Sequence, residues 1–191
     1  MKHKQFGFTL LELMVAVSIA GILATLAAPS FRTLLVRRSV QAAAESLVAD
    51  MRLARSESLK RSTRTVICKS TDGANCDVAG VDNNWKVGWI VFVDMNSDGL
   101  FTAASPGVAG DELVKVQQSL PNIATIQQDV NPSNTRVIFR YEPTGWSKAS
   151  SQSFNVTPVG GAAGDATTRV VCVSNNGRPS LRVEGTSVCN N

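Results

Sequence analysis

An apolar segment near the N-terminus defines the first element of the chain. Residues 8–31 are almost entirely apolar, and no charged side chain occurs between Leu13 and Pro29. At ~1.5 Å rise per residue this segment forms a helix of about 36 Å, whereas the hydrocarbon core of a bilayer is ~30 Å thick. The pattern therefore predicts a transmembrane helix over residues 8–31.

Glu12 is the one carboxylate within this segment. A charge at bilayer depth costs ~2.5–3.5 kcal/mol. Either Glu12 is paired with a positive group, or it lies near enough to the membrane interface for its carboxylate to reach water. The sequence leaves both alternatives open.

The helical pattern continues beyond the apolar segment. Apolar or small residues recur at steps of three and four from Phe31 to Ser58, and the other face carries Arg37, Arg38, Asp50 and Arg52. This predicts an amphipathic half-helix over residues 32–62 with those four side chains in solvent. Pro29 lacks a backbone donor and is expected to kink the helix between the two halves.

After Arg64 the hydrophobic period changes to two, which is typical of strands. Gly, Pro, Asn and Asp residues separate the segments, and no helical stretch intervenes, which favours antiparallel sheets. The predicted strands are 65–68, 86–93, 112–116, 123–127, 136–141, 153–157, 169–174 and 181–183. The predicted fold is α+β, a long N-terminal helix packed on the antiparallel sheets of a domain over residues 63–191.

The first seven residues differ from an ordinary secretory signal. A short basic stretch ends in the small residue Gly7, which precedes the apolar segment, whereas a secretory cleavage site follows it. Residues 7–13, Gly-Phe-Thr-Leu-Leu-Glu-Leu, resemble the leader signature of type IV pilins and type II secretion pseudopilins. The resemblance implies that a prepilin peptidase cleaves after Gly7 and that Phe8 is N-methylated. It further implies that Glu12 pairs with the N-terminal amine of a neighbouring subunit, and that Pro29 kinks the assembly helix.

Three later segments resemble one branch of that family, the H-type pseudopilins and the FimT/FimU-type minor pilins. They are residues 66–70, 88–94 and 170–178. The resemblance implies a structural subunit of a pilus or secretion filament, single-pass in the bacterial inner membrane with a periplasmic domain, and extracellular after assembly. Other pilins are the expected partners, in a complex that initiates or tips the filament. Two alternatives remain, DNA capture for uptake and contact with secreted proteins.

The chain contains four cysteines, Cys68, Cys76, Cys172 and Cys189. An even number outside the cytoplasm indicates two disulfides, and the pairs Cys68–Cys76 and Cys172–Cys189 are favoured because each closes a local loop that contains turn residues. Free buried thiols are the alternative. Zinc is not expected, since neither pair has ligand spacing and His3 is the only histidine.

Asp94, Asn96 and Asp98, followed by Gly99, match the start of a calcium-binding loop. The closing glutamate is absent, because Ser105 occupies the twelfth position. The two hypotheses are a Ca²⁺ site and a polar turn between strands. No other cofactor is expected.

Arg178 follows Gly177, and Arg182 lies four residues further on. Some FimT-type minor pilins bind DNA through a C-terminal glycine-arginine motif with a second arginine two residues later, so this chain resembles that motif only in part. The alternatives are a salt-sensitive phosphate contact and two solvent-facing arginines. The formal charge of +4 decides little, because basic segments flank an acidic middle.

Catalysis is not expected. A chain processed after Gly7 lacks histidine, which excludes Ser-His-Asp, Cys-His and His-ligated metal sites. Neither a G-x-S-x-G motif nor a phosphate-binding glycine loop is present. Trp85, Trp89 and Trp146 are expected in the core or on a sheet face rather than as stacking platforms.

Overall fold

The computed structural model describes residues 8–77, 82–107, 109–129, 138–147, 152–161, 167–183 and 189. Two compact units make up the chain, one ending at Val36 and the other beginning at Arg37. One long helix contributes to both units, and the strands all belong to the second.

The helix α1 spans Leu10–Arg61. Thr9 caps its start, because its hydroxyl Oγ1 accepts a hydrogen bond from the backbone N–H of Glu12 at 3.2 Å. Its end is set by Ser62, whose left-handed conformation (φ 51°) stops the helix while Thr63 N–H bonds to the carbonyl of Ser58. The helix thus ends within the range expected from the sequence.

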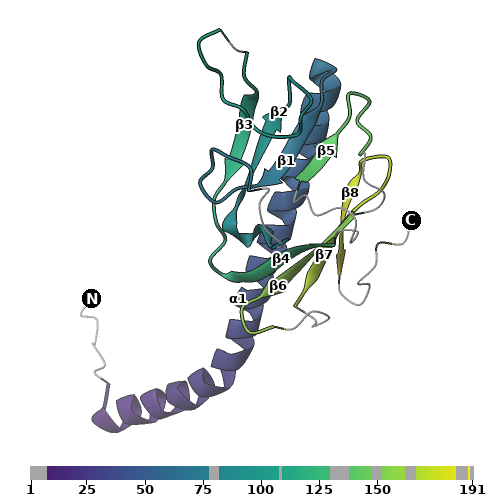
Figure 1. Ribbon diagram of the computed structural model, residues 1–191. Helices are drawn as coiled ribbons and strands as arrows, with labels where there is room; N and C mark the ends of the chain where they lie inside the picture. The colour runs from purple at the N-terminus through teal and green to yellow at the C-terminus, as the bar shows by residue number, and fades with distance from the viewer. Residues whose placement is uncertain are drawn as a thin grey trace, which may run out of the picture. The chain divides into compact units, whose positions relative to one another are not determined.

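The described strands form two four-stranded antiparallel sheets, with the orders β3-β2-β1-β5 and β4-β6-β7-β8 (Figure 1). The strands are β1 Thr65–Lys69, β2 Trp89–Val93, β3 Glu112–Gln117, β4 Ile123–Asp129, β5 Ile138–Tyr141, β6 Gln152–Pro158, β7 Arg169–Val173 and β8 Pro179–Val183. The prediction of an α+β fold with a long N-terminal helix and antiparallel sheets is confirmed.

The C-terminal half of α1 forms the core of the second unit together with both sheets. Leu47, Met51 and Ala54 are fully buried and cluster with Trp89 of the first sheet and Phe154 of the second. These three helix positions follow the three-and-four spacing of the amphipathic pattern. Phe31, Leu34 and Leu35 were expected on the same stripe, but within the first unit they are about half exposed or more.

The two central strands of the first sheet, β1 and β2, are buried on both faces. A second apolar cluster, which includes Val66, Cys68 and Phe92, lies on the face away from α1 and is covered by Phe101 and Cys76. Every residue of β1 and β2 is consequently buried, which explains why these strands read as continuous apolar runs rather than as a strict alternation.

Three expectations about single residues are wrong. Asp50 is buried rather than in solvent, because it accepts hydrogen bonds from the indole of Trp89 at 2.9 Å and from Lys115. Trp146 is 58% exposed and lies outside the strands, rather than in the core or on a sheet face. The strand expected from Lys86 begins at Trp89, since a 3-10 turn, Trp85–Val87, precedes it.

Gly88 separates that turn from β2. It adopts φ 118°, and a Cβ at this position would lie 2.5 Å from the carbonyl oxygen of Gln117. The close approach of two backbones therefore requires glycine here. Of the strand expected over 136–141, residues 136 and 137 lie outside the described residues, and β5 begins at Ile138.

Candidate functional site

The start of α1 carries the residues for which the sequence predicts processing and assembly. Phe8 precedes the capping residue Thr9 and is 79% exposed, and Glu12 lies exposed in the first helical turn. Gly7 lies outside the described residues. Thr9 and Glu12 have the spacing of a capping box, S/T-x-x-E, which the sequence analysis did not use.

Glu12 has no basic partner within the described residues. Its backbone N–H bonds to Thr9, and its carboxylate takes part in no ion pair there. A carboxylate at N3 is favourable for its own helix because it faces the positive end of the macrodipole. Because it forms no ion pair within the described residues, the carboxylate can accept a positive group from another subunit.

Around Glu12 the first unit presents a surface of apolar side chains. The exposed large ones between residues 10 and 23 are Leu10, Leu11, Leu13, Met14, Val15, Val17, Ile19, Ile22 and Leu23. An exposed apolar surface of this extent is typical of a membrane contact or a protein interface. It does not distinguish between the two.

The length and continuity of α1 bear on the predicted membrane span. Within the described residues, no single helix has both the length and the apolar composition needed to cross a membrane. The segments Leu10–Thr25 and Ser30–Arg61, which are bent relative to each other, meet both requirements only when they are taken together. Pro29 lies in the break between these segments. The span over residues 8–31 stays a prediction.

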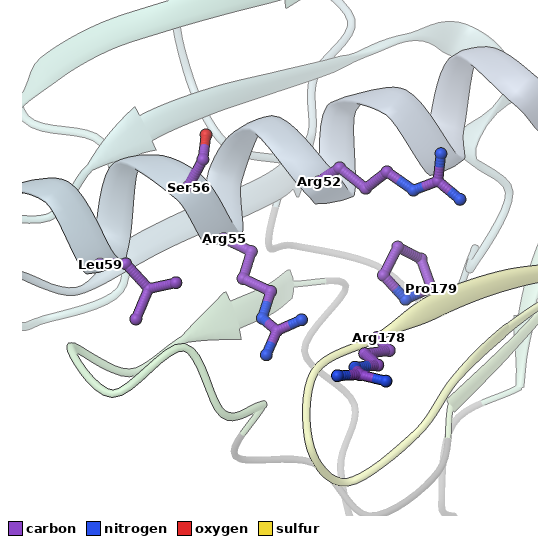
Figure 2. Close-up of a pocket in the computed structure, with 6 residues that line it drawn as sticks. All are labelled: Arg52, Arg55, Ser56, Leu59, Arg178 and Pro179. Carbon is purple, nitrogen blue, oxygen red and sulfur yellow. The ribbon is translucent and has the colours of Figure 1, made fainter.

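A second candidate site is a pocket of about 400 Å³ in the second unit. We call it the arginine pocket, and its lining residues are Arg52, Arg55, Ser56, Leu59, Arg178 and Pro179. Figure 2 shows Arg55 reaching from α1 toward Arg178, which lies in the turn before β8, while Pro179 begins that strand. The lining thus combines guanidinium groups with the apolar side chains of a leucine and a proline.

A tight turn positions Arg178 in this pocket. Gly177 closes the turn with φ 76°, and a Cβ there would lie 2.3 Å from the carbonyl oxygen of Gly145. The same carbonyl accepts a hydrogen bond from Arg55 Nε at 3.0 Å. Gly145 therefore links the arginine of the helix to the turn that carries Arg178.

The charges of the arginine pocket are not neutralised by the described residues. Arg52, Arg55 and Arg178 form no ion pair with an acidic side chain there. Guanidinium groups bind carboxylates and phosphates with several directed hydrogen bonds. The arrangement can therefore bind an anion, and doing so would offset the repulsion between the three like charges.

Arg182 does not line this pocket. It is half-buried on β8, opposite Val170 of β7. The structure places Arg178 with Arg52 and Arg55 instead, a grouping that the sequence analysis missed. The signal was available, because Arg52, Arg55, Ser56 and Leu59 have the spacing of one helical face.

Both disulfides are present and join the residues expected from local loop closure. Cys68 of β1 pairs with Cys76, and Cys172 of β7 pairs with Cys189. Asp72 organises the first loop by accepting hydrogen bonds from the side chain of Asn75 and from the backbone N–H groups of Ala74 and Asn75, which holds the pKa of its carboxyl well below 3.8.

The expected calcium residues lie between β2 and β3. Asp94 is fully buried directly after β2, and Asn96 and Asp98 are exposed in the following turn. Within the described residues, no group of three or more His, Cys, Asp and Glu side chains has the arrangement of a metal site. A cation here would also need amide and peptide oxygens.

Comparisons with known proteins agree with this architecture. Residues 43–177 match the family of the type II transport protein GspH, and residues 2–28 match the prokaryotic N-terminal methylation motif. A type IV major fimbrial protein FimA of Dichelobacter nodosus is 29% identical over 124 residues, which cover 61% of this chain and 77% of that protein.

Two solved structures share the fold. The type IV minor pilin FimU of Pseudomonas aeruginosa superimposes with a TM-score of 0.52 at 19% identity, covering 81% of this chain and 97% of that one. The minor pseudopilin EpsH of the Vibrio cholerae type II secretion system superimposes with a TM-score of 0.50 at 10% identity, covering 78% and 99%.

The methylation motif, the long N-terminal helix and the two antiparallel sheets define a minor pilin or pseudopilin. The chain belongs to the GspH family. The expected family and class are confirmed. Family and fold are those of structural proteins, and the N-terminal features are those of a membrane-anchored pilin.

Proposed function

We propose that this protein is a filament subunit that is inserted in the bacterial inner membrane, processed at its N-terminus and then assembled with other pilins. Its domain would lie in the periplasm before assembly and on an extracellular filament afterwards. The observation that carries the proposal is the position of Glu12, a carboxylate without a basic partner in the described residues, in the first turn of α1, where the exposed large side chains between residues 10 and 23 are apolar.

The proposed processing creates the positively charged group with which Glu12 can pair. Cleavage after Gly7 creates a positively charged amine at Phe8, and N-methylation leaves that charge in place. The amine of one subunit can then pair with Glu12 of its neighbour, which offsets the cost of placing either charge among apolar side chains. The apolar surface supplies contact area, and the ion pair fixes the register of the two helices.

The mature N-terminus tests the proposed processing. Mass spectrometry of the protein from cells that carry a prepilin peptidase should give a chain beginning with N-methylated Phe8. Gly7→Val should retain residues 1–7, whereas Gln5→Ala, which alters the leader outside the cleaved bond, should be processed normally. A native protein that keeps Met1 in the mature filament fraction would contradict the proposed processing.

DNA capture is a second candidate function, and the arginine pocket is the observation that favours it. Its three guanidinium groups lie within one pocket of the second unit, without an acidic partner among the described residues. Binding of phosphates there would be electrostatic, independent of base sequence and weakened by salt.

Fluorescence anisotropy with labelled DNA across a salt series tests this second function. Arg178→Ala should weaken binding and reduce the slope of log K against log salt by about one unit. Arg38→Ala is the matched control, because it removes the same charge from an exposed helix position outside the pocket. Absence of binding at low salt, or an equal effect of both variants, would exclude the pocket as a DNA site.

A further inference from the structure

The connection between β2 and β3 begins and ends at buried aspartates. Asp94 follows the last residue of β2, and Asp111 precedes the first residue of β3. Val93 and Glu112 are cross-strand partners, so both aspartates lie at the base of the same connection. Their exposed fractions are 0% and 8%, which is unusual for two carboxylates that form no ion pair with any residue the structure describes.

The two aspartates differ in their hydrogen bonds. Asp111 is satisfied, because its Oδ1 accepts from Met95 N–H and its Oδ2 from Thr102 N–H, each at 2.8 Å. It therefore joins the two limbs of the connection. Asp94 is only half satisfied, because Oδ2 accepts from Gly99 N–H at 3.1 Å, whereas the buried Oδ1 has no hydrogen-bond partner within the described residues.

The carboxyl group of Asp94 is held against the turn by its other oxygen, Oδ2. The bond from Gly99, five residues further along, fixes the carboxyl group inside the turn, and both oxygens share one carbon. A buried carboxylate oxygen that lacks a donor is a strong acceptor for a ligand that supplies positive charge.

Further oxygen atoms are held in the same turn. Asn96 Oδ1 accepts from Asp98 N–H at 3.1 Å, and Asp98 Oδ1 accepts from Leu100 N–H at 2.7 Å. Oxygen ligands at positions one, three and five, a glycine at six and a peptide carbonyl at seven are the arrangement that suits Ca²⁺. In this chain those positions are Asp94, Asn96, Asp98, Gly99 and Leu100.

The electrostatic environment favours a cation. The connection carries three carboxylates, those of Asp94, Asp98 and Asp111, and the hydrogen bonds to Asp94 and Asp111 come from uncharged backbone N–H groups. Arg64 reaches the turn, but its Nη1 bonds to the carbonyl of Ser97, and its guanidinium also pairs with Glu142. Arg140 also lies near the turn, with its Nη1 at 3.9 Å from the Cβ position of Gly99, but neither arginine forms an ion pair with Asp94 within the described residues.

We propose that residues 94–100 bind Ca²⁺ through Asp94 Oδ1, the side-chain oxygens of Asn96 and Asp98 and the carbonyl of Leu100, with water completing the coordination. Ca²⁺ accepts six to eight oxygens in flexible geometry, whereas Mg²⁺ demands a near-ideal octahedron. Without a closing glutamate the affinity should fall at ~10⁻⁴–10⁻³ M, the range of extracellular calcium modules. The site is independent of processing and of filament assembly.

Calcium titration of the full chain in detergent tests the site. Calorimetry and thermal unfolding are measured in EDTA-treated protein with CaCl₂, and in parallel with MgCl₂ at equal ionic strength. CaCl₂ should give saturable heat and raise the melting temperature, with a midpoint at ~10⁻⁴–10⁻³ M. MgCl₂ should give a clearly smaller rise.

Two variants and a control locate the ion. Asp94→Asn keeps an oxygen for Gly99 N–H but removes the charge, so its calcium response should disappear while its calcium-free melting temperature does not fall. Asp98→Asn, at an exposed position, should weaken binding about tenfold and covers the case in which Asp94→Asn misfolds. Asp72→Asn changes an aspartate of another exposed turn and should respond to calcium as the native protein does.

Three outcomes overturn the proposal. The first is the absence of heat and of any melting shift in the folded native protein up to about 10 mM Ca²⁺, ten times the upper end of the expected range. The second is an equal response to Mg²⁺, and the third is an unchanged calcium response when both Asp94 and Asp98 are replaced.

Discussion

The buried carboxylate of Asp50 on α1 accepts a hydrogen bond from the indole Nε1 of Trp89 on β2 at 2.9 Å. Lys115 of the neighbouring strand β3 donates to the other oxygen of the same carboxylate. One side chain of the helix thus connects two adjacent strands of the first sheet. The three groups form a polar link inside an otherwise apolar core.

Removing Lys115 should destabilise the second unit. Lys115→Ala leaves Asp50 as a buried charge without its cation, which costs about 3–5 kcal/mol when one partner of a buried pair is lost. Lys115 is partly exposed and Trp89 remains as a donor, so we expect the lower end of this range. Denaturant unfolding followed by tryptophan fluorescence measures the change in the free energy of unfolding.

Lys60→Ala is the control for this prediction. Lys60 is also a lysine paired with a carboxylate, but its side chain is 74% exposed and its distance to Glu57 is 3.9 Å. Its replacement should change the free energy of unfolding by no more than about 0.5 kcal/mol. Equal effects of both variants would show that the buried pair adds nothing.

Gly177 should tolerate no side chain, since it combines a positive φ with a close backbone contact. Gly177→Ala should lower the melting temperature more than Gly160→Ala does. Gly160 has a similar φ of 79° but open space around an added Cβ, so it reports the backbone strain of about 1–2 kcal/mol alone. Similar melting temperatures for the two variants would contradict the close packing of Gly177 on Gly145.

Each disulfide should stabilise the second unit by about 2–3 kcal/mol, because the cross-links span 8 and 17 residues of sequence. Cys68→Ala/Cys76→Ala and Cys172→Ala/Cys189→Ala should each lower the free energy of unfolding by this amount. A reducing agent should lower it in the native protein but not in a variant that lacks all four cysteines. Thiol titration of the unfolded native protein should find no free cysteine.

Stability should fall in acid, in part through Asp72 and Glu112. The hydrogen bonds of its turn lower the pKa of Asp72 below 3.8, and the guanidinium of Arg61 lowers that of Glu112 below 4.5. A carboxyl group with a lowered folded pKa stabilises the protein above its unfolded pKa, and that contribution is lost as the pH falls through the folded value.

Melting temperatures between about pH 5 and pH 2 test this acid dependence. The double variant Asp72→Asn/Glu112→Gln should give a flatter curve than the native protein, and the difference between their melting temperatures should shrink toward the acid end. Parallel curves would show that neither carboxylate contributes through its charge.

Periodicity predicted the long helix and most strands because burial on one face imposes a repeat that local sequence displays. Asp50 and Trp146 were placed wrongly because their environments depend on Trp89, Lys115 and a tight turn, which are distant in sequence or set by backbone geometry. For the same reason the sequence paired Arg178 with Arg182, whereas tertiary packing pairs Arg178 with Arg52 and Arg55. The disulfides were predictable because both are local.

The most direct test of the proposed assembly is the incorporation of Glu12 variants into filaments in cells that lack the native copy. Glu12→Gln keeps the size of the side chain and the Thr9 cap, whereas Glu12→Asp keeps the charge. The measurement is the amount of protein in sheared filaments relative to that in membranes. An unpaired charge at membrane depth costs about 2.5–3.5 kcal/mol, and the proposed ion pair offsets this cost. Glu12→Gln leaves the neighbouring amine unpaired, so it should reduce this ratio by about tenfold or more. Glu12→Asp should retain part of the ratio. A ratio for Glu12→Gln equal to that of the native protein would contradict the proposed pairing of Glu12 with a neighbouring amine.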